Sequence, residues 1–289
     1  MLKKYMTMIV AGLLTCTISF SQEMVKHEIS VWGSGGLSTL KIDTNTGDAK
    51  NKAGGSVGIG YSYIINSDWS IGSGLELAFY NGKYSLKEFS DSYNANDGQY
   101  DFVFHTTAKN YREIQNVTYL NIPIMATFQR PVTGNNNFYV SAGFKFGIPV
   151  SKKSTVTNAD FNNYGYYPEW ENPIKDDPYF MGFGTFKSTD KKGNLELKTS
   201  YMLSLETGMK WRLTDNLGLY TGVYFDYGLN DVKKNSDKRA IQYNTENPSN
   251  YIHNSAISSH YSLDNTSVTM VEKVNTIAVG VKAKLAFCL

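Results

Sequence analysis

The chain has 289 residues, of which 41% are hydrophobic and 19% are charged, and its formal net charge is +2. This balance excludes a disordered acidic or basic chain, and it gives no reason to expect nucleic acid as a partner. The length suits one large all-β domain or two smaller domains. The 21 tyrosines and 15 phenylalanines favour strands, and the 25 glycines favour a crowded or strongly curved sheet.

The N-terminus has the pattern of a secretory signal peptide. Two lysines near the start precede an apolar run over residues 6–14, and small and polar residues follow as far as Gln22. The run is too short to cross a membrane as a helix. We therefore predict a signal peptide over residues 1–22 and one domain over residues 23–289. Cys16 leaves lipidation of the N-terminus as an alternative.

Eight later segments alternate apolar and polar residues with a period of two, which is the pattern of a β-strand. The last segment is the clearest, because every odd position from Ile277 to Leu289 is apolar. Pro123, in the fourth segment, cannot donate a ladder hydrogen bond, so we expect a local bulge there. The predicted strands span residues 28–40, 54–64, 69–80, 117–129, 138–148, 195–213, 217–229 and 273–289.

The connections between these strands alternate between short and long. Short turns cover residues 66–68, 131–137 and 214–216, and long polar segments cover residues 81–112, 151–194 and 230–272. This alternation is typical of an up-and-down outer-membrane barrel, in which brief turns face the periplasm and longer loops face outward. An even number of strands then places both chain ends on the periplasmic side.

The two faces of the predicted strands differ in chemistry. One face is almost free of charge, whereas the other combines many glycines with four acids and five bases. A soluble sandwich or barrel would bury the apolar face, and the glycines on the charged face would then have no role. In a membrane barrel the apolar face meets lipid, and small residues and paired charges fill a narrow lumen. The predicted lumen charge network consists of Glu28, Glu76, Lys145, Glu206, Lys210, Arg212, Asp226, Lys282 and Lys284.

These patterns predict an all-β fold, an eight-stranded antiparallel up-and-down transmembrane β-barrel in the outer membrane of a Gram-negative cell. The charged interior allows two interpretations. The charges either pair and close the lumen, or they line a narrow ion path and make the protein a small, porin-like channel. Eight strands leave room only for side chains, which favours the closed lumen.

No motif in the sequence indicates catalysis or metal binding. The four histidines, His27, His105, His253 and His260, lack the spacing of a metal site, and neither a nucleophile-elbow nor a phosphate-loop sequence occurs. We therefore predict no cofactor, no metal and no enzymatic activity. A lipid-modifying enzyme remains an alternative, and it needs an activated Ser/His or Asp/His group near the outer rim.

Several stretches resemble the barrel domains of the OmpA-like outer-membrane family, in the long-looped branch described as an outer membrane protein beta-barrel domain. These stretches are SVWGSGGLSTL (residues 30–40), GYSYIINSDWSIGSGLELAFYN (60–81), YLNIPIMATFQ (119–129), GLYTGVYFDYGLND (218–231) and the aromatic-ending last strand. Many members continue into a periplasmic peptidoglycan-binding domain, which is not expected here because the sequence ends at Leu289. The resemblance implies that Phe287 is an assembly signal for the barrel-assembly machinery, although Cys288 and Leu289 follow it.

Together these observations predict a monomeric, non-enzymatic envelope protein that is surrounded by outer-membrane lipid. The three long polar segments, rich in Tyr, Asn and Asp, suit contacts with an extracellular protein or glycan. An accessory role in envelope transport or secretion is the other alternative beside the channel.

Overall fold

The computed structural model describes residues 26–289 except residues 45, 135, 189, 235–236 and 264–265, so the predicted signal peptide lies outside the described residues. The strands are β1 (His27–Asp43), β2 (Asp48–Asn51), β3 (Ala53–Ile64), β4 (Trp69–Asn96), β5 (Asp101–Thr133), β6 (Asn136–Tyr167), β7 (Asn172–Ile174), β8 (Gly184–Ser188), β9 (Lys191–Asn194), β10 (Ser200–Arg212), β11 (Leu217–Gly228), β12 (Ile241–Gln242), β13 (Ile252–His253), β14 (His260–Leu263), β15 (Thr266–Thr269) and β16 (Lys273–Cys288). Two short 3₁₀ turns, η1 (Pro168–Trp170) and η2 (Ala256–Ser258), complete the elements of the described part. The predicted all-β class is confirmed, and none of the described helices is long and apolar enough to cross a membrane.

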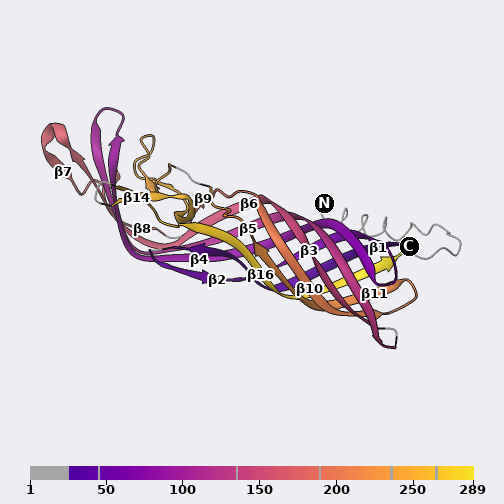
Figure 1. Ribbon diagram of the computed structural model, residues 1–289. Coiled ribbons are helices and arrows are strands. Elements are labelled where there is room, and N and C mark those ends of the chain that lie inside the picture. The colour runs from indigo at the N-terminus through magenta and orange to yellow at the C-terminus, as the bar shows by residue number, and fades with distance from the viewer. Residues whose placement is uncertain (1–25, 45, 135, 189, 235–236, 264–265) are drawn as a thin grey trace, which may run out of the picture.

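The longest strands pair in a cyclic order. Antiparallel pairing runs β10-β11-β16-β1-β3-β4-β5-β6, and β6 pairs in turn with β10. We call this set the ring. The first and last strands of the chain are neighbours in it, because Glu28 lies opposite Cys288. Figure 1 shows the ring strands wound around a common axis at the right of the picture.

Side chains alternate between the two sides of the ring as the sequence predicts. Apolar residues such as Leu77, Phe144 and Val281 point outward and are exposed. Glycines on the inner side make room for the large indole of Trp32. A Cβ atom at Gly58 would lie 2.4 Å from carbon atoms of this indole, so no larger residue fits there. The inner side of the ring is therefore filled, and the outer side is an apolar belt.

Two of the three predicted long loops, residues 81–112 and 151–194, consist largely of strand, and the third contains four short strands, which corrects the sequence-based expectation. Residues 81–112 form the outer parts of β4 and β5, which pair as far as Asn96 and Asp101. Residues 151–194 contain the continuation of β6 together with β7, β8 and β9, which all pair with β6. Residues 230–272 contain β12 to β15 and η2. We call these three segments together the extension, and Figure 1 shows it projecting from one end of the ring.

The extension has a hydrophobic core of its own. Inward-facing aromatic residues of β4, β5 and β6, including Tyr84, Phe104 and Phe161, are almost fully buried. Residues 230–272 fold over them and contribute Ile241 and Ile257 to the same core. The face that is polar within the ring thus becomes apolar in the extension. A period-two pattern continues along β4, but the chemistry of its two faces is exchanged.

The predicted bulge at Pro123 is wrong. The register between β4 and β5 is the same on both sides of this residue, since Ser73 pairs with Ile124 and Glu76 with Asn121. Here the ladder skips only Pro123 and Ile122, because Pro123 has no N–H to donate. The Ser73 hydroxyl instead donates a hydrogen bond of 2.8 Å to the carbonyl of Pro123, which helps to hold the strands together without an inserted residue.

Truncating Phe104 tests whether the extension is a packed unit. The phenyl group of Phe104 contacts the aromatic side chains of Tyr93, Phe183 and Tyr243 in the extension core. We expect Phe104→Ala to destabilise the extension by about 3–5 kcal/mol and to expose it to trypsin, while the ring stays intact. Limited proteolysis of the detergent-extracted protein measures this. Phe144→Ala, on the outward face of the ring, is the control, and an unchanged digestion pattern for Phe104→Ala would show that the extension has no cooperative core.

Candidate functional site

Three charged side chains meet in the middle of the ring interior. The ammonium group of Lys145, on β6, lies 3.1 Å from Glu76 Oε1, on β4, and 2.8 Å from Asp226 Oδ2, on β11. All three side chains are at least 96% buried. One cation thus bridges two carboxylates that belong to strands on different sides of the ring.

Neutral side chains complete the hydrogen bonding of these carboxylates. Trp32 Nε1 donates to Glu76 Oε2 over 3.0 Å, and Asn121 Nδ2 donates to Glu76 Oε1 over 2.9 Å. Ser204 donates to Asp226 Oδ1 over 2.6 Å. Buried charges are tolerated only when pairing and hydrogen bonds replace the lost hydration. The middle of the ring therefore forms one connected polar group.

Two further ion-pair groups lie on the inner side of the ring. Glu28 is 3.2 Å from Lys210 and 3.9 Å from Lys284, and it also accepts a hydrogen bond of 2.9 Å from the Tyr220 hydroxyl. Lys282 pairs with Glu206, and its ammonium group lies 4.7 Å from the centre of the Trp32 ring. A cation over an aromatic face is electrostatically favourable, so Trp32 contacts both the central group and a neighbouring pair.

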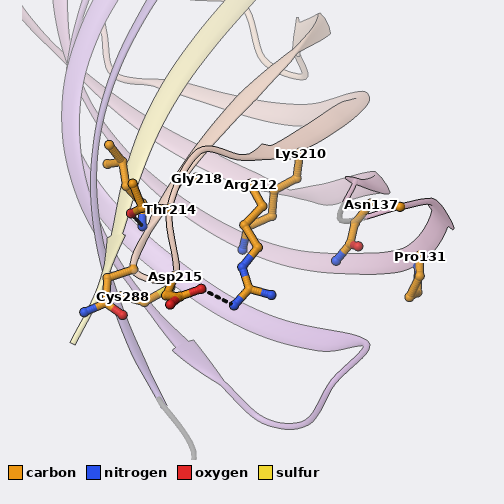
Figure 2. Close-up of a pocket in the computed structure, with 11 residues that line it drawn as sticks. Pro131, Asn137, Lys210, Arg212, Thr214, Asp215, Gly218 and Cys288 are labelled. Atoms are coloured by element: carbon orange, nitrogen blue, oxygen red, sulfur yellow. Dashed lines mark hydrogen bonds and ion pairs between the residues drawn. The ribbon is translucent and has the colours of Figure 1, made fainter.

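Eight of the nine residues of the predicted charge network therefore lie in these three groups, and Arg212 is the exception. Its guanidinium is half exposed and lies 3.1 Å from Asp215 Oδ1 in the turn between β10 and β11. Figure 2 shows this pair at a recess of about 330 Å³, which is also lined by Asn137, Lys210 and Cys288. Arg212 is the last residue of β10, so its position at the end of the strand places it at the rim and not in the interior.

Sequence reasoning did not assign a role to several residues that complete these groups. Trp32 and Asn121 share the polar face of the predicted strands, so their position was visible in the alternation. Their donation to Glu76 could not be predicted, because it depends on which strands face each other across the ring. Phe287, the predicted assembly signal, points outward near the end of β16 and pairs with Ile29 and Leu217.

Where β5 passes into the extension, a buried carboxylate fastens residues 230–272 to the sheet. Glu113, on β5, is fully buried and accepts hydrogen bonds from the Tyr111 hydroxyl, the Gln115 amide, the Ser255 hydroxyl and the backbone N–H of Ala256. The last two donors lie at the start of η2. Because Glu113 is reached from a segment more than 140 residues away, it links the two layers of the extension core.

A charged pair and a histidine add to this fastening. Arg239 pairs with Asp91 of β4, and its guanidinium lies 4.7 Å from the centre of the Tyr93 ring. Burial raises the pKa of Asp91, and its hydrogen bond from the Ser262 N–H and the charge of Arg239 oppose this change. His253 packs on Phe161, and burial, with the nearby charge of Lys191, lowers the pKa of this histidine to about 4.

The far end of the extension carries exposed aromatic side chains. Trp170 stacks on Tyr167 with 4.7 Å between ring centres, and its ring lies 4.9 Å from that of Tyr100. Tyr179 and Phe180 are 95% and 77% exposed. Figure 1 shows β7, which follows Trp170, and the β4–β5 hairpin at the end of the extension farthest from the ring. We call Tyr100, Trp170, Tyr179 and Phe180 the tip aromatics.

Among the described residues, no three His, Cys, Asp or Glu side chains gather as a metal site requires. His105 stacks on Tyr164 with 4.4 Å between ring centres, and His27 Nδ1 lies 2.6 Å from the Tyr61 hydroxyl.

One family model matches the chain over residues 20–234, and its description is "Outer membrane protein beta-barrel domain". None of the curated proteins compared with the chain matches it significantly. Several solved structures, among them the following three, have weak similarity to the chain. Neisserial surface protein A is 12% identical, with a TM-score of 0.36, over 92% of this chain and 98% of its own.

The other two structures come from Yersinia pestis and Escherichia coli. Ail, the attachment invasion locus protein of Y. pestis, was solved in complex with the heparin analogue sucrose octasulfate; it is 10% identical, with a TM-score of 0.29, over 91% of this chain and 99% of its own. The outer membrane protease OmpT of E. coli is 11% identical, with a TM-score of 0.28, over 95% of this chain and all of its own. Scores this low indicate neither a shared ligand nor a shared activity.

Replacing Lys145 tests the central group. Lys145→Met leaves Glu76 and Asp226 as two buried carboxylates without a cation, so we expect the ring to lose about 3–5 kcal/mol of stability. The exposed pair of Arg212 contributes less than about 1 kcal/mol, which makes Arg212→Gln the matched control. Urea unfolding in lipid vesicles measures both variants. Equal stability of the two variants would show that the central group does not stabilise the ring.

The lowered pKa of His253 predicts a pH dependence of the extension. A histidine whose folded-state pKa is below its unfolded value of 6.5 contributes full stability above pH 6.5, and this contribution is lost as the pH falls towards 4. We expect cleavage of the extension by an acid-active protease to increase as the pH falls over this range. His253→Gln removes the titrating group, so the variant should show a smaller pH response than the parent. An identical pH response in both proteins would exclude His253 as its source.

Proposed function

Because the chain belongs to the outer-membrane protein β-barrel domain family, we propose that its ring is an eight-stranded antiparallel transmembrane barrel that holds the extension outside the cell as a contact surface for protein or glycan. The protein is located in the outer membrane. The observation that carries the proposal is the change of face chemistry along β4, β5 and β6. The outward face is apolar in the ring and polar in the extension, as a strand that leaves lipid for water requires.

The cyclic strand order supports a closed barrel. A sheet in lipid cannot leave an edge, because unpaired backbone groups have no water to bind there. The pairing of β6 with β10 removes the edges that an open sheet of these strands would have. The shortest ring strands, β3 and β11, have 12 residues each, which exceeds the 9–11 residues that cross a bilayer at the usual tilt.

The paired interior supports a barrel that does not conduct ions. Glu76, Lys145 and Asp226 contact one another across the middle, and Trp32 fills space beside them. The void between Trp32, Glu76 and Lys282 measures only about 50 Å³. This is room for one or two water molecules, and an ion path needs a continuous column.

We further propose that the protein is not an enzyme and acts as a monomer. Two of the three histidines of the extension, His105 and His253, each pack on an aromatic ring, whereas a catalytic base needs a nucleophile within hydrogen-bond reach. The proposed partners are outer-membrane lipid around the apolar belt and the barrel-assembly machinery at the last strand. Phe287 supports the second partner, since its side chain faces outward near the end of β16.

The extension suits recognition because its shape is fixed before any partner arrives. Its strands are hydrogen-bonded to their ends, and its core anchors residues 230–272 through Glu113. A preorganised surface loses little conformational entropy on binding. The tip aromatics supply large, rigid side chains of the kind that dominate protein and glycan contacts.

Orientation and closure can be tested on one preparation. We expect the outer-membrane fraction to contain a band that migrates faster before boiling than after it. An impermeant amine reagent should label Lys175 and Lys187 of the extension on intact cells, but Lys26, at the other end of the ring, only after lysis. Planar bilayers should show no discrete conductance. Extension lysines that are labelled only after lysis would reverse the orientation, and steady channel currents would exclude the closed barrel.

Contact through the tip aromatics predicts a specific loss of binding. We expect Trp170→Ala with Tyr179→Ala to lower binding of the purified protein to its best ligand on a glycan or extracellular-protein array by about tenfold or more. Tyr201→Ala with Val223→Ala, on the apolar belt, is the control for two lost large side chains. Binding that survives the tip variant would move the contact surface elsewhere on the extension.

A further inference from the structure

A band of cations crosses five neighbouring strands where the ring passes into the extension. Its members are Lys50 on β2, Lys83 on β4, Arg112 on β5, Lys153 on β6 and Lys192 on β9. We call these residues the basic band. Four of them are exposed and Lys83 is partly so. On β4 and β5 their positions continue the outward face that carries the apolar belt.

The strand register brings these cations close together. Lys50 lies directly opposite Lys83 in the β2–β4 pair, and like charges at opposed positions repel each other. Arg112 pairs with Ser85, two residues along β4 from Lys83. Lys153 and Lys192 occupy diagonal positions of the β6–β9 pair, because Lys192 is opposite Thr155. The fold thus concentrates positive charge at a cost to its own stability.

Carboxylates do not neutralise the basic band. In the rows of paired residues that contain the five cations, Asp48, opposite Ser85, is the one acid. The net charge of these rows is therefore +4. Within the described part of the chain, none of the five cations has a carboxylate oxygen within 4.0 Å. At the other end of the ring, by contrast, Arg130 pairs with Asp68 and Arg212 with Asp215. The two rims of the apolar belt therefore differ in unbalanced charge.

Lys83 and Lys153 of the basic band lie just beyond the apolar belt, within side-chain reach of the headgroup layer of a bilayer. Lys83 lies four residues beyond Phe79, and Lys153 lies three residues beyond Val150, both of which are exposed on the belt. With strands tilted by about 40°, these separations correspond to about 10 and 8 Å along the membrane normal. The polar layer outside the hydrocarbon is about 5–8 Å thick, and lysine side chains bend towards such a layer.

We propose that the basic band binds the phosphorylated headgroups of lipids in the outer leaflet. Phosphate oxygens would separate the opposed ammonium groups of Lys50 and Lys83, and the guanidinium of Arg112 suits a bidentate phosphate contact. Asn116, opposite Lys153, offers an amide donor in the same row. The assignment to the outer leaflet rests on the orientation proposed above, whereas binding of the headgroup itself does not.

The test uses the full mature chain in dodecyl maltoside micelles, with lipid A that carries two phosphates and the same lipid after dephosphorylation. Native mass spectrometry counts the lipids retained. We expect the parent protein to prefer the phosphorylated lipid by about tenfold or more, and to lose the preference when the concentration of the ammonium acetate buffer is raised to about 0.5 M. Equal retention of the two lipids by the parent protein would overturn the proposal without any variant.

Matched variants locate the binding. Lys50→Gln, Lys83→Gln and Lys153→Gln together should abolish the preference, while Lys26→Gln, Lys175→Gln and Lys187→Gln together remove the same charge elsewhere and should keep it. A faster band before boiling confirms that each variant is folded. A preference that survives the first variant, or is lost equally in both, would show that general charge and not the basic band holds the lipid. Because this measurement is independent of orientation, it can succeed even where cell-surface labelling fails.

Discussion

The ammonium group of Lys145 is the point on which the interior of the ring depends. It contacts carboxylates of two other strands, and it brings β4, β6 and β11 to fixed positions across a space that contains no backbone hydrogen bonds. Charges so deeply buried need every remaining oxygen bonded, and Trp32 is one of the donors that meets this need. The indole in turn requires the absence of side chains at Gly58. The buried charges, the Trp32 indole and Gly58 therefore depend on one another.

A second constraint is the change of solvent along single strands. In the ring, the inner face of β4 carries Glu76 and its outer face carries Leu77. Beyond Tyr80 the same inner face carries Tyr84 and Leu86, while the outer face carries Lys83 and Ser85. Hydrogen bonding to β5 continues across the change. The backbone pairing is the same on both sides of this exchange, and only the side-chain chemistry differs.

This exchange explains which parts of the fold the sequence could predict. The ring strands were found because their two faces contrast strongly over the whole length of a membrane crossing. The sequence predicts loops for the outer parts of β4 to β6 because their apolar face is built of tyrosines and phenylalanines and interrupted by polar residues such as Asp91. Its partner surface, residues 230–272, is too distant in sequence for any local pattern to reveal. Within the predicted lumen charge network, Arg212 alone lies at the rim, because alternation does not show where a strand reaches the rim.

The continuity of β4, β5 and β6 has a mechanical consequence. Each of these strands has 28 to 33 residues and runs from the ring into the extension as one continuous strand. A pull or a twist applied at Trp170 is therefore transmitted through the covalent chain and the paired backbone into the membrane. A mobile loop in place of these strands would transmit less of it. The extension and the ring would then move together, so a tethered partner would tilt the whole molecule in the bilayer before it deformed the tip.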